Sequence, residues 1–458
     1  MKFWNELKAA MLSNPTQLLC EGEAQLTYSE AVAYAEQFSH RIVGNSCCAI
    51  FCQSELNAAL SLLACFAADV TAVPVSSRYG EAHCQKILAA ISPSAIISDR
   101  GGQHEVVQES HSTYIPPLER PALIMCTSGT TGTPKGAMLT KTNICTNVND
   151  ICHYLDIGAE DRILIARPLY HCAVLTGEFL VGLRKGAQIR FYSDKFNPSS
   201  ILGLIRKHNI TVFGGTPTLL GAMARFSKEP VPLRAVCVSG ECMRKETGIQ
   251  IADAFPDAKI YHVYGLTEAC PRVAYLPPRL FREKPDSVGI PLRSVFLRIM
   301  KNDCVEAKNG EEGILYVKGG NVMAGYYNAP EETARVLKNG WLRTGDIAVM
   351  DEDGWLHIRG RADDLIIRGG MNIYPAEVEN SLKASPKVRD VLVYQIEHPE
   401  MGVQIGMKIA GEFESTAEVK QLCIALLPSY QVPTHIELLS ELPKNGSGKL
   451  IRKKMEAR

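Results

Sequence analysis

A loop rich in glycine, hydroxyl and lysine groups follows the apolar run Ala122 to Cys126 and reads Thr-Ser-Gly-Thr-Thr-Gly-Thr-Pro-Lys-Gly over Thr127 to Gly136. Glycines let a backbone turn successive N–H groups toward one anion, and hydroxyl and ammonium groups add donors and charge. A Walker loop would need glycine where Pro134 stands, so that template fails. The loop therefore favours a site for nucleotide phosphates, with an ordinary surface loop as the alternative.

Three further segments carry groups that suit the other parts of a nucleotide. Tyr264-Gly-Leu-Thr-Glu268 places an aromatic ring, a hydroxyl and a carboxylate within one turn, which suits a base, a phosphate and Mg²⁺. Asp346 and Arg361 could hydrogen-bond the two ribose hydroxyls. Lys449 ends a glycine-rich tip that begins at Pro443. Taken singly, each segment is also compatible with an ordinary turn, cap or solvated charge.

In their order and spacing these segments resemble the class I adenylate-forming superfamily, which includes acyl-CoA synthetases, luciferases and adenylation domains of nonribosomal peptide synthesis. The resemblance extends from about Thr27 to Arg452. It implies an AMP-forming acid–thiol ligase that uses ATP and Mg²⁺, releases pyrophosphate and leaves an acyl-adenylate. The acyl group would then pass to the thiol of CoA, or alternatively to the phosphopantetheine of an acyl carrier protein.

The resemblance also assigns roles to individual residues. The catalytic positions would be Lys449, His171, Thr267 and Glu268, with Glu268 as the Mg²⁺ ligand and Asp363 as the hinge between domains. Nucleotide binding would involve Thr127, Ser128, Gly129, Thr130, Thr131, Gly132, Lys135, Gly240, Glu241, Cys242, Tyr264, Gly265, Asp346 and Arg361. The acid pocket would be lined by His171, Phe213, Gly214, Gly215, Val238, Ser239, Gly240 and Ala269.

The class of acid follows from the segment after His171, which resembles the gate of the family's acid pocket. Amino-acid-activating relatives place an aspartate near this segment to pair with the substrate ammonium, whereas Cys172 to Leu175 carries no charge. The other lining positions are mostly small and apolar, and Gly214 and Gly215 are expected to open space. We therefore expect an unsubstituted fatty or aryl acid.

Two other functional classes share parts of this pattern. A luciferase-like oxygenase has the same fold and the same adenylation step, and these motifs do not separate it from a ligase. A nonenzymatic nucleotide sensor could keep the phosphate loop, but binding alone hardly requires Lys449 and Glu268. A ligase is therefore the preferred prediction.

Alternation of helical and strand-like patterns in the first part of the chain predicts βαβ units and parallel sheets, hence an α/β fold. From Ser294 onward the pattern becomes all-β, which predicts a distorted β-barrel subdomain. The pattern of apolar and polar residues changes again at Arg359 to Asp364, and a small α+β domain is expected after this point. The predicted organisation is an adenylation domain over 1–360 and a small, mobile C-terminal domain over 363–458, with the hinge at 361–364.

Composition narrows the partners and the compartment. A chain of 458 residues is longer than one hydrophobic core usually stabilises, so more than one domain is expected. The 49 basic residues balance 49 acidic ones, so nucleic acid is not expected as a partner. No run is long and apolar enough to predict a membrane span, and we expect a cytoplasmic monomer or homodimer. The 15 cysteines are scattered without a Cys-x-x-Cys pair, which favours buried reduced thiols.

Overall fold

The computed structural model describes residues 2–76, 81–100, 103–109, 111–117, 119–127, 134–194, 196–302, 304–368, 371–398 and 402–442. The chain divides into two compact units. The first comprises Met1–Glu241, Gly248–Leu297 and Tyr316–Arg343, and the second comprises Cys242–Thr247, Arg298–Leu315 and Thr344–Arg458. The predicted boundary near residue 360 stays a prediction.

A nine-stranded sheet of the first unit has the order β15-β14-β13-β12-β11-β9-β10-β1-β2. Its strands are β1 (Leu18–Glu21), β2 (Ala24–Thr27), β9 (Arg162–Ile165), β10 (Gln188–Phe191), β11 (Val212–Gly215), β12 (Ala235–Val238), β13 (Lys259–Gly265), β14 (Arg272–Leu276) and β15 (Ile290–Pro291). From β1 across to β13 all neighbours pair in parallel, whereas β14 and β15 are antiparallel. The carboxyl ends of the parallel strands therefore meet at one edge of the sheet.

A seven-stranded sheet of the same unit has the order β18-β8-β7-β4-β3-β5-β6. Its strands are β3 (Cys47–Phe51), β4 (Thr71–Pro74), β5 (Ala95–Arg100), β6 (Gln103–Gln108), β7 (Leu123–Thr127), β8 (Lys135–Leu139) and β18 (Gly325–Tyr326). β7 and β8 pair antiparallel with Thr127 opposite Lys135, and β18 pairs with β8 on its other side. The two ends of the predicted phosphate loop thus lie side by side.

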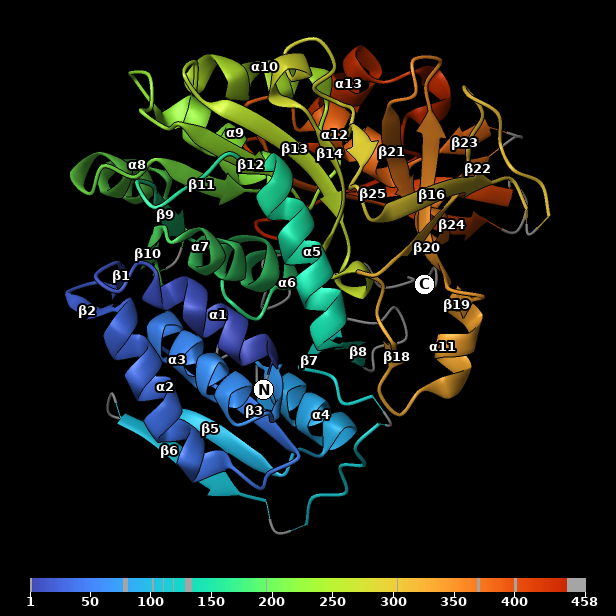
Figure 1. Cartoon of the computed structure of the whole chain (residues 1–458). Coiled ribbons are helices and arrows are strands. Elements are labelled where there is room, and N and C mark those ends of the chain that lie inside the picture. The colour runs from blue at the N-terminus through green and yellow to red at the C-terminus, as the bar shows by residue number, and fades with distance from the viewer. Residues whose placement is uncertain are drawn as a thin grey trace. The chain divides into compact units, whose positions relative to one another are not determined.

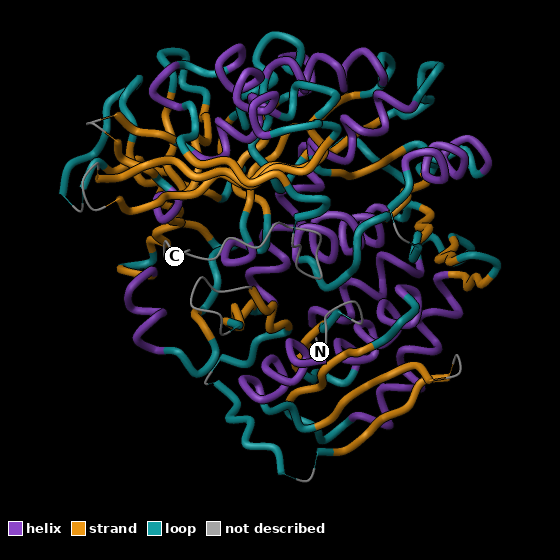
Figure 2. The backbone as a smooth tube through the Cα atoms, turned by 180° about the vertical axis from the view of Figure 1, so that it is seen from behind, coloured by secondary structure: helices purple, strands orange, loops and turns teal. Residues whose placement is uncertain are grey.

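Helices separate the two sheets and cover their outer faces. Figure 1 shows α1 (Lys2–Leu12), α3 (Glu55–Ala67), α5 (Lys141–Tyr154) and α7 (Leu180–Lys185) between the sheets, and Figure 2 shows the same helical layer from behind. The remaining described helices of this unit are α2 (Tyr28–Ile42), α4 (Glu81–Ile91), α6 (Cys172–Val174), α8 (Pro198–Lys207), α9 (Pro217–Phe226), α10 (Lys245–Ala254), which belongs to this unit from Gly248 onward, and α11 (Pro330–Val336). Across the nine-stranded sheet, the chain moves from β9 to β10 toward one edge. It then moves from β10 through β11 and β12 to β13 toward the opposite edge. Right-handed crossovers therefore place α8 and α9 on the opposite face from α7.

Local signals explain why several of these helices begin where they do. Thr27 and Glu30 form a capping box at the start of α2, and Thr140 and Asn143 form one at the start of α5. The start of α7 differs, because a π-helical turn, η1 (Leu175–Phe179), precedes it. Such turns often occur at functional sites.

A curled five-stranded sheet corresponds to the barrel-like subdomain expected after Ser294. It contains β16 (Val295–Met300), β17 (Gly313–Gly319), β19 (Leu337–Lys338), β20 (Trp341–Met350) and β21 (Leu356–Arg361). The expectation of an all-β region was wrong in one respect, because α11 lies within it. A proline at the first turn and acidic residues after it start that helix.

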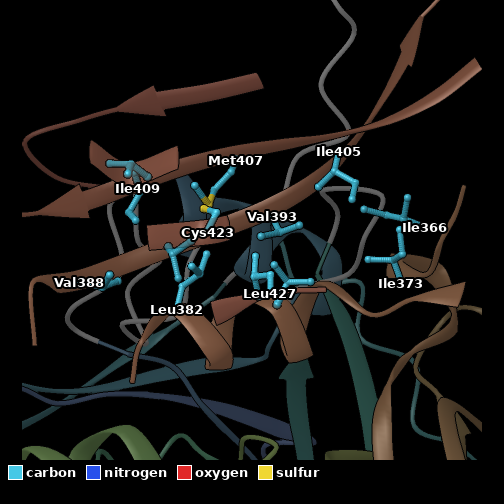
Figure 3. Close-up of a cluster of buried hydrophobic side chains, with 13 residues drawn as sticks. Ile366, Ile373, Leu382, Val388, Val393, Ile405, Met407, Ile409, Cys423 and Leu427 are labelled. Atoms are coloured by element: carbon cyan, nitrogen blue, oxygen red, sulfur yellow. The ribbon is translucent and has the colours of Figure 1, made fainter. Parts of the chain in front are cut away.

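The C-terminal part of the second unit is a small α+β domain, as predicted. Its sheet has the order β24-β25-β26, with β24 (Val388–His398), β25 (Gly402–Gly411) and β26 (His435–Leu438). The other elements here are α12 (Pro375–Leu382), α13 (Thr416–Leu426) and the hairpin β22 (Ile366–Arg368) and β23 (Met371–Ile373). Val393, Met407, Ile409 and Cys423 meet in a buried core between the helices and the sheet (Figure 3).

The α/β class with parallel sheets and a small C-terminal domain is confirmed. All the cysteines are free, and most of them are buried, as expected. Within the described part of the chain, no helix has the length and apolar character needed to cross a bilayer.

A pair of isoleucines tests the core of the C-terminal domain. Ile409 is fully buried, whereas Ile424 on α13 is 55% exposed. We expect Ile409→Ala to lower the free energy of unfolding by about 2–5 kcal/mol, because it removes apolar contacts and leaves a cavity. Ile424→Ala should change it by less than about 0.5 kcal/mol. Urea unfolding curves of the two variants and the wild type would check this, and equal shifts would contradict the assigned core.

Candidate active site

The predicted pocket residues gather at the carboxyl-terminal edge of the nine-stranded sheet. Gly215 pairs in register with Val238, and Val238 pairs with His262, two residues before Tyr264. His171 follows β9, the neighbour of β11 on the other side. Ligands of open α/β sheets bind outside the carboxyl ends of the strands. The sheet order thus brings these predicted positions to the edge where a ligand is expected.

Lys135 lies at one end of the predicted phosphate loop, of which Ser128 to Thr133 lie outside the described residues. Its Nζ lies 2.5 Å from Glu332 Oε2 on α11 and 5.5 Å from the centroid of the Tyr326 ring. The hydrogen bond from Lys135 holds the pKa of Glu332 below its usual value. Thr127, at the other end of the loop, donates its hydroxyl to the Lys135 carbonyl at 3.4 Å. Lys135 is therefore held beside the loop by a carboxylate and an aromatic face.

Glu268, the predicted metal ligand, accepts a hydrogen bond of 2.8 Å from the Tyr326 hydroxyl at Oε1. Its carbonyl also accepts the Met323 N–H at 2.9 Å. Tyr326 thus contacts both predicted groups, Lys135 through its ring and Glu268 through its hydroxyl. Neither Tyr326 nor Glu332 was found from the sequence, because no motif surrounds them.

Buried amides position the turn that carries Thr267 and Glu268. This turn is a short 3-10 helix, η2 (Thr267–Ala269). The Asn321 amide donates to the Ala269 carbonyl at 2.8 Å, and the Asn147 amide donates to the Arg272 carbonyl at 2.7 Å. Gly265 precedes the turn, and any side chain there would collide with the Pro271 carbonyl oxygen. Gly265 and the two amides together fix the backbone position of Glu268.

The donor set around Glu268 fits one kind of metal. Among the described residues there is no group of three or more His, Cys, Asp or Glu side chains that could hold an ion. Mg²⁺ is usually bound by one or two carboxylates together with waters and substrate phosphates. A single carboxylate beside a phosphate loop fits that arrangement, and it does not fit an all-protein cage.

The gate segment lies against the Glu268 turn. His171 is the N-cap of α6, and its ring centroid lies 4.3 Å from that of Tyr170. The Thr176 hydroxyl donates to the Cys270 carbonyl at 3.2 Å, which ties η1 to the residues after Glu268. Burial, opposed by the Thr176 hydrogen bond and aided by the charge of Glu268, raises the pKa of the Cys172 thiol to about 12. Cys172 is thus a protonated thiol at the site.

The expectation that Gly214 and Gly215 open the pocket was wrong. A Cβ at Gly214 would lie 2.7 Å from the Cδ of Glu178, and one at Gly215 would lie 3.0 Å from Leu219 and Leu220 side-chain carbons. The space beside Gly214 is therefore filled by the Glu178 carboxylate from η1. Phe213 and Val238 are fully buried, and Ala269 is as well. The glycines are needed for close packing rather than for open volume.

Charged side chains, which sequence reasoning missed, lie beside the predicted pocket. Arg167 Nη2 donates to Glu178 Oε1, and Arg167 Nη1 lies 3.4 Å from Ser239 Oγ. Arg272 is 2% exposed and donates to the Tyr154 hydroxyl at 2.5 Å. A signal was present in the sequence, because Glu178 interrupts an otherwise apolar run.

The positions assigned to adenine fall in both units. Gly240 has φ of +96°, a left-handed conformation that favours glycine, and Glu241 accepts the Thr218 hydroxyl at 2.6 Å. Tyr264 is half-buried near the end of β13. Cys242 belongs to the second unit, where its carbonyl accepts the Asn380 amide at 3.2 Å.

The second unit brings Asp346 and Arg361 together. They are paired in register on β20 and β21, and Arg361 Nη1 donates to Asp346 Oδ1 at 3.1 Å and to the Thr344 carbonyl at 2.9 Å. Asp363 follows on an exposed 3-10 turn, η4 (Ala362–Asp364). Lys449 lies outside the described residues.

Two family models match most of this chain. The family model described as "AMP-binding enzyme" matches residues 7–327, and the one described as "AMP-binding enzyme C-terminal domain" matches residues 377–449. A feruloyl-CoA synthase of an Amycolatopsis species is 33% identical over 81% of this chain and 76% of its own length.

Solved structures of o-succinylbenzoate CoA synthetase from Bacillus subtilis are similar over almost the whole chain. The complex with the acyl-adenylate intermediate has a TM-score of 0.86 and 27% identity, and covers 98% of this chain and 99% of the synthetase. The complex with ATP and a magnesium ion has a TM-score of 0.85 and 27% identity, with coverage of 97% and 98%. Both sheets and the C-terminal domain are thus included in the similarity.

The state of Cys172 can be tested by alkylation. With a pKa of about 12, roughly one thiol in ten thousand is ionised at pH 8, and the side chain is buried. We expect iodoacetamide to modify exposed Cys304 in the folded protein and to leave Cys172 unmodified, with both modified in urea. Peptide mass spectrometry would measure this. Modification of Cys172 in the folded protein as fast as that of Cys304 would contradict it.

Proposed function

This chain belongs to the AMP-binding enzyme family, and we propose on that basis that it activates a carboxylic acid with ATP and transfers the acyl group to the thiol of CoA. In the first step a carboxylate oxygen attacks the α-phosphorus of ATP, pyrophosphate leaves, and an acyl-adenylate forms. In the second step the thiol attacks the carbonyl and AMP leaves. The feruloyl-CoA and o-succinylbenzoate relatives support CoA as the acceptor.

The observation that carries this proposal is the connection from Glu332 through Lys135 and Tyr326 to Glu268. It joins Lys135, at the end of the predicted phosphate loop, to a carboxylate that suits Mg²⁺. A binding module for an uncharged ligand would have no use for an ammonium and a carboxylate that contact the same tyrosine. A nucleotide triphosphate with its magnesium ion uses both.

The chemistry demands charge neutralisation and positioning, because the acid and ATP are both anions. Lys135 and the loop N–H groups would bind the phosphates that leave as pyrophosphate, and Thr267 would contact the α-phosphate. Magnesium, when bound by Glu268, supplies further neutralisation of phosphate charge. Lys449 would bridge the attacking carboxylate and the phosphate during adenylation.

Other residues would bind the adenine and the ribose of ATP and would form the hinge. Tyr264 would pack on adenine together with Gly240, Glu241 and Cys242, and the carboxylate of Asp346 would hold the ribose with Arg361. The Arg361 hydrogen bonds support this role, since they hold the Asp346 carboxylate in place. Asp363, on its exposed turn, would act as the hinge that lets Lys449 leave before the thiol attacks.

Pyrophosphate release tests the proposal. We expect release from ATP and Mg²⁺ that depends on one class within a panel of fatty, aryl and amino acids. Lys449→Ala and Glu268→Gln should lower kcat by about 10²–10³-fold, because each removes a group that stabilises charge in the transition state. Glu36→Gln is the matched control, since Glu36 pairs with Lys8 on the surface. Silence across the panel, or full activity of both variants, would contradict the proposal.

Tyr326 gives a second test, directed at Glu268. Tyr326→Phe keeps the ring over Lys135 and removes the hydrogen bond that orients the carboxylate. We expect the Mg²⁺ concentration for half-maximal rate to rise about 10-fold, with kcat at saturating Mg²⁺ little changed. Tyr327→Phe is the control, because the Tyr327 hydroxyl accepts the Ile115 N–H instead. A fall in kcat without a change in Mg²⁺ dependence would contradict this role.

A further inference from the structure

The ammonium of Lys135, which would bind the leaving phosphates, is paired with a carboxylate of the protein itself. Its Nζ lies 2.5 Å from Glu332 Oε2, and the other oxygen of this carboxylate accepts a hydrogen bond of 3.0 Å from Arg335 Nη1. The hydrogen bond and the charge of Lys135, with a smaller contribution from Arg335, hold the pKa of Glu332 below its usual value. Glu332 is therefore ionised at neutral pH and acts as a counter-ion of Lys135.

The fold brings this counter-ion to Lys135. Lys135 begins β8, and β8 pairs with β18. On β18, the Tyr326 N–H is donated to the Thr333 hydroxyl of α11 at 2.8 Å, and this hydroxyl is donated to the Ala329 carbonyl at 2.8 Å. Glu332 is the residue before Thr333. The contact between the carboxylate and the ammonium thus follows from backbone positions that the sheet and the helix fix.

Water reaches both side chains of this ion pair. The Lys135 side chain is 23% exposed and that of Glu332 is 27% exposed. Ion pairs that water can reach are weak, and an ammonium has three hydrogens to donate, so a second anion can approach Lys135. A phosphate oxygen of a nucleotide can therefore either replace the Glu332 carboxylate at Lys135 or share the ammonium with it.

Both arrangements make phosphate binding less favourable. Replacement costs the existing ion pair. Sharing places two anions on one cation, within about 5 Å of each other, where like charges repel even in water. Lys135 is therefore a weaker phosphate ligand beside the Glu332 carboxylate than it would be beside a neutral side chain.

Pyrophosphate is the anion whose retention depends most on this contact. ATP is also held through its adenine and ribose, for which residues other than Lys135 are proposed. Pyrophosphate has phosphate contacts only, so a weaker contact with Lys135 is a larger part of its affinity. In the reverse of the first step, a pyrophosphate oxygen attacks the α-phosphorus of the acyl-adenylate, the carboxylate leaves and ATP re-forms. Weak retention of pyrophosphate therefore favours the forward reaction.

We propose that Glu332 competes with phosphate for the Lys135 ammonium and thereby promotes the release of pyrophosphate after adenylation. This role rests on the proposed function, because it requires that Lys135 binds the leaving phosphates. Glu332 acts through Lys135 and does not touch the reacting atoms. The ion pair between the two residues re-forms as pyrophosphate leaves.

The substitution Glu332→Gln tests this role, because it keeps the size of the side chain and removes its charge. We expect the Kd of magnesium pyrophosphate, measured by isothermal titration calorimetry, to fall about 5-fold to 10-fold, with a similar fall for ATP. Loss of a merely structural contact would weaken binding instead. Glu331→Gln is the matched control, since Glu331 is exposed, lies in the same turn of α11 and changes charge equally. Its Kd values should stay within about twofold of the wild type.

Turnover gives a second measurement on the same variants. Formation of AMP with an accepted acid and CoA should be inhibited by added pyrophosphate at about 5-fold to 10-fold lower concentration in Glu332→Gln than in the wild type. Inorganic pyrophosphatase should restore the wild-type time course, because it removes the product that rebinds. Since Glu332 is partly exposed, the midpoint of urea unfolding should not change, which confirms that the variant is folded.

The outcomes separate this role from the proposed function. A wild type that binds neither ATP nor pyrophosphate and forms no AMP with any acid would contradict the proposed function, and the role of Glu332 with it. A wild type that is active, with pyrophosphate bound equally or more weakly by Glu332→Gln, would overturn only the role of Glu332. Equal tightening in Glu331→Gln would also overturn it, because the cause would then be general charge rather than the contact with Lys135.

Discussion

The hydrogen bond from Tyr326 to Glu268 joins the two sheets of the first unit at the predicted site. Tyr326 lies on β18, at one edge of the seven-stranded sheet, and Glu268 follows β13 of the nine-stranded sheet. The Met323 N–H, also donated to the Glu268 carbonyl, makes a second connection at the same point. One sheet carries the ends of the predicted phosphate loop and the other the predicted metal ligand. These two contacts, together with the helical layer between the sheets, hold the two predicted groups close to each other.

The turn after β13 shows how much of the structure serves that arrangement. Its backbone is bound by amides of Asn147 and Asn321, which come from α5 and from the segment before β18. Buried amides of this kind are costly when unpaired and specific when paired. Gly265 allows the strand to pass close to Pro271, where any side chain would collide. The Glu268 backbone is thus fixed by these contacts, and its side chain is oriented by the hydrogen bond from Tyr326.

Buried charges beside the predicted acid pocket depend on one another. Replacing a whole buried ion pair by apolar residues is often neutral or stabilising, whereas removing one partner leaves an uncompensated buried charge. Arg167 and Glu178 are both largely buried, so each side chain relies on the other for its neutralisation. The π-helical turn that carries Glu178 brings its carboxylate against Gly214.

The sequence by itself determined the chemistry of the ligand and most of the elements. The motifs Thr127 to Gly136 and Tyr264 to Glu268 each lie within one short stretch of sequence, so they could be recognised without the fold. The hydrophobic periods of strands and helices are also short-range and could be recognised in the same way. Only the tertiary structure decided which side chains meet across it. Tyr326 and Glu268 are 58 residues apart, and Lys135 and Glu332 are 197 residues apart, so no local pattern records their contact. The tertiary structure also decided that Glu178 fills the space beside Gly214. A glycine in the sequence indicates that some group approaches closely, but it does not indicate which side chain that group belongs to.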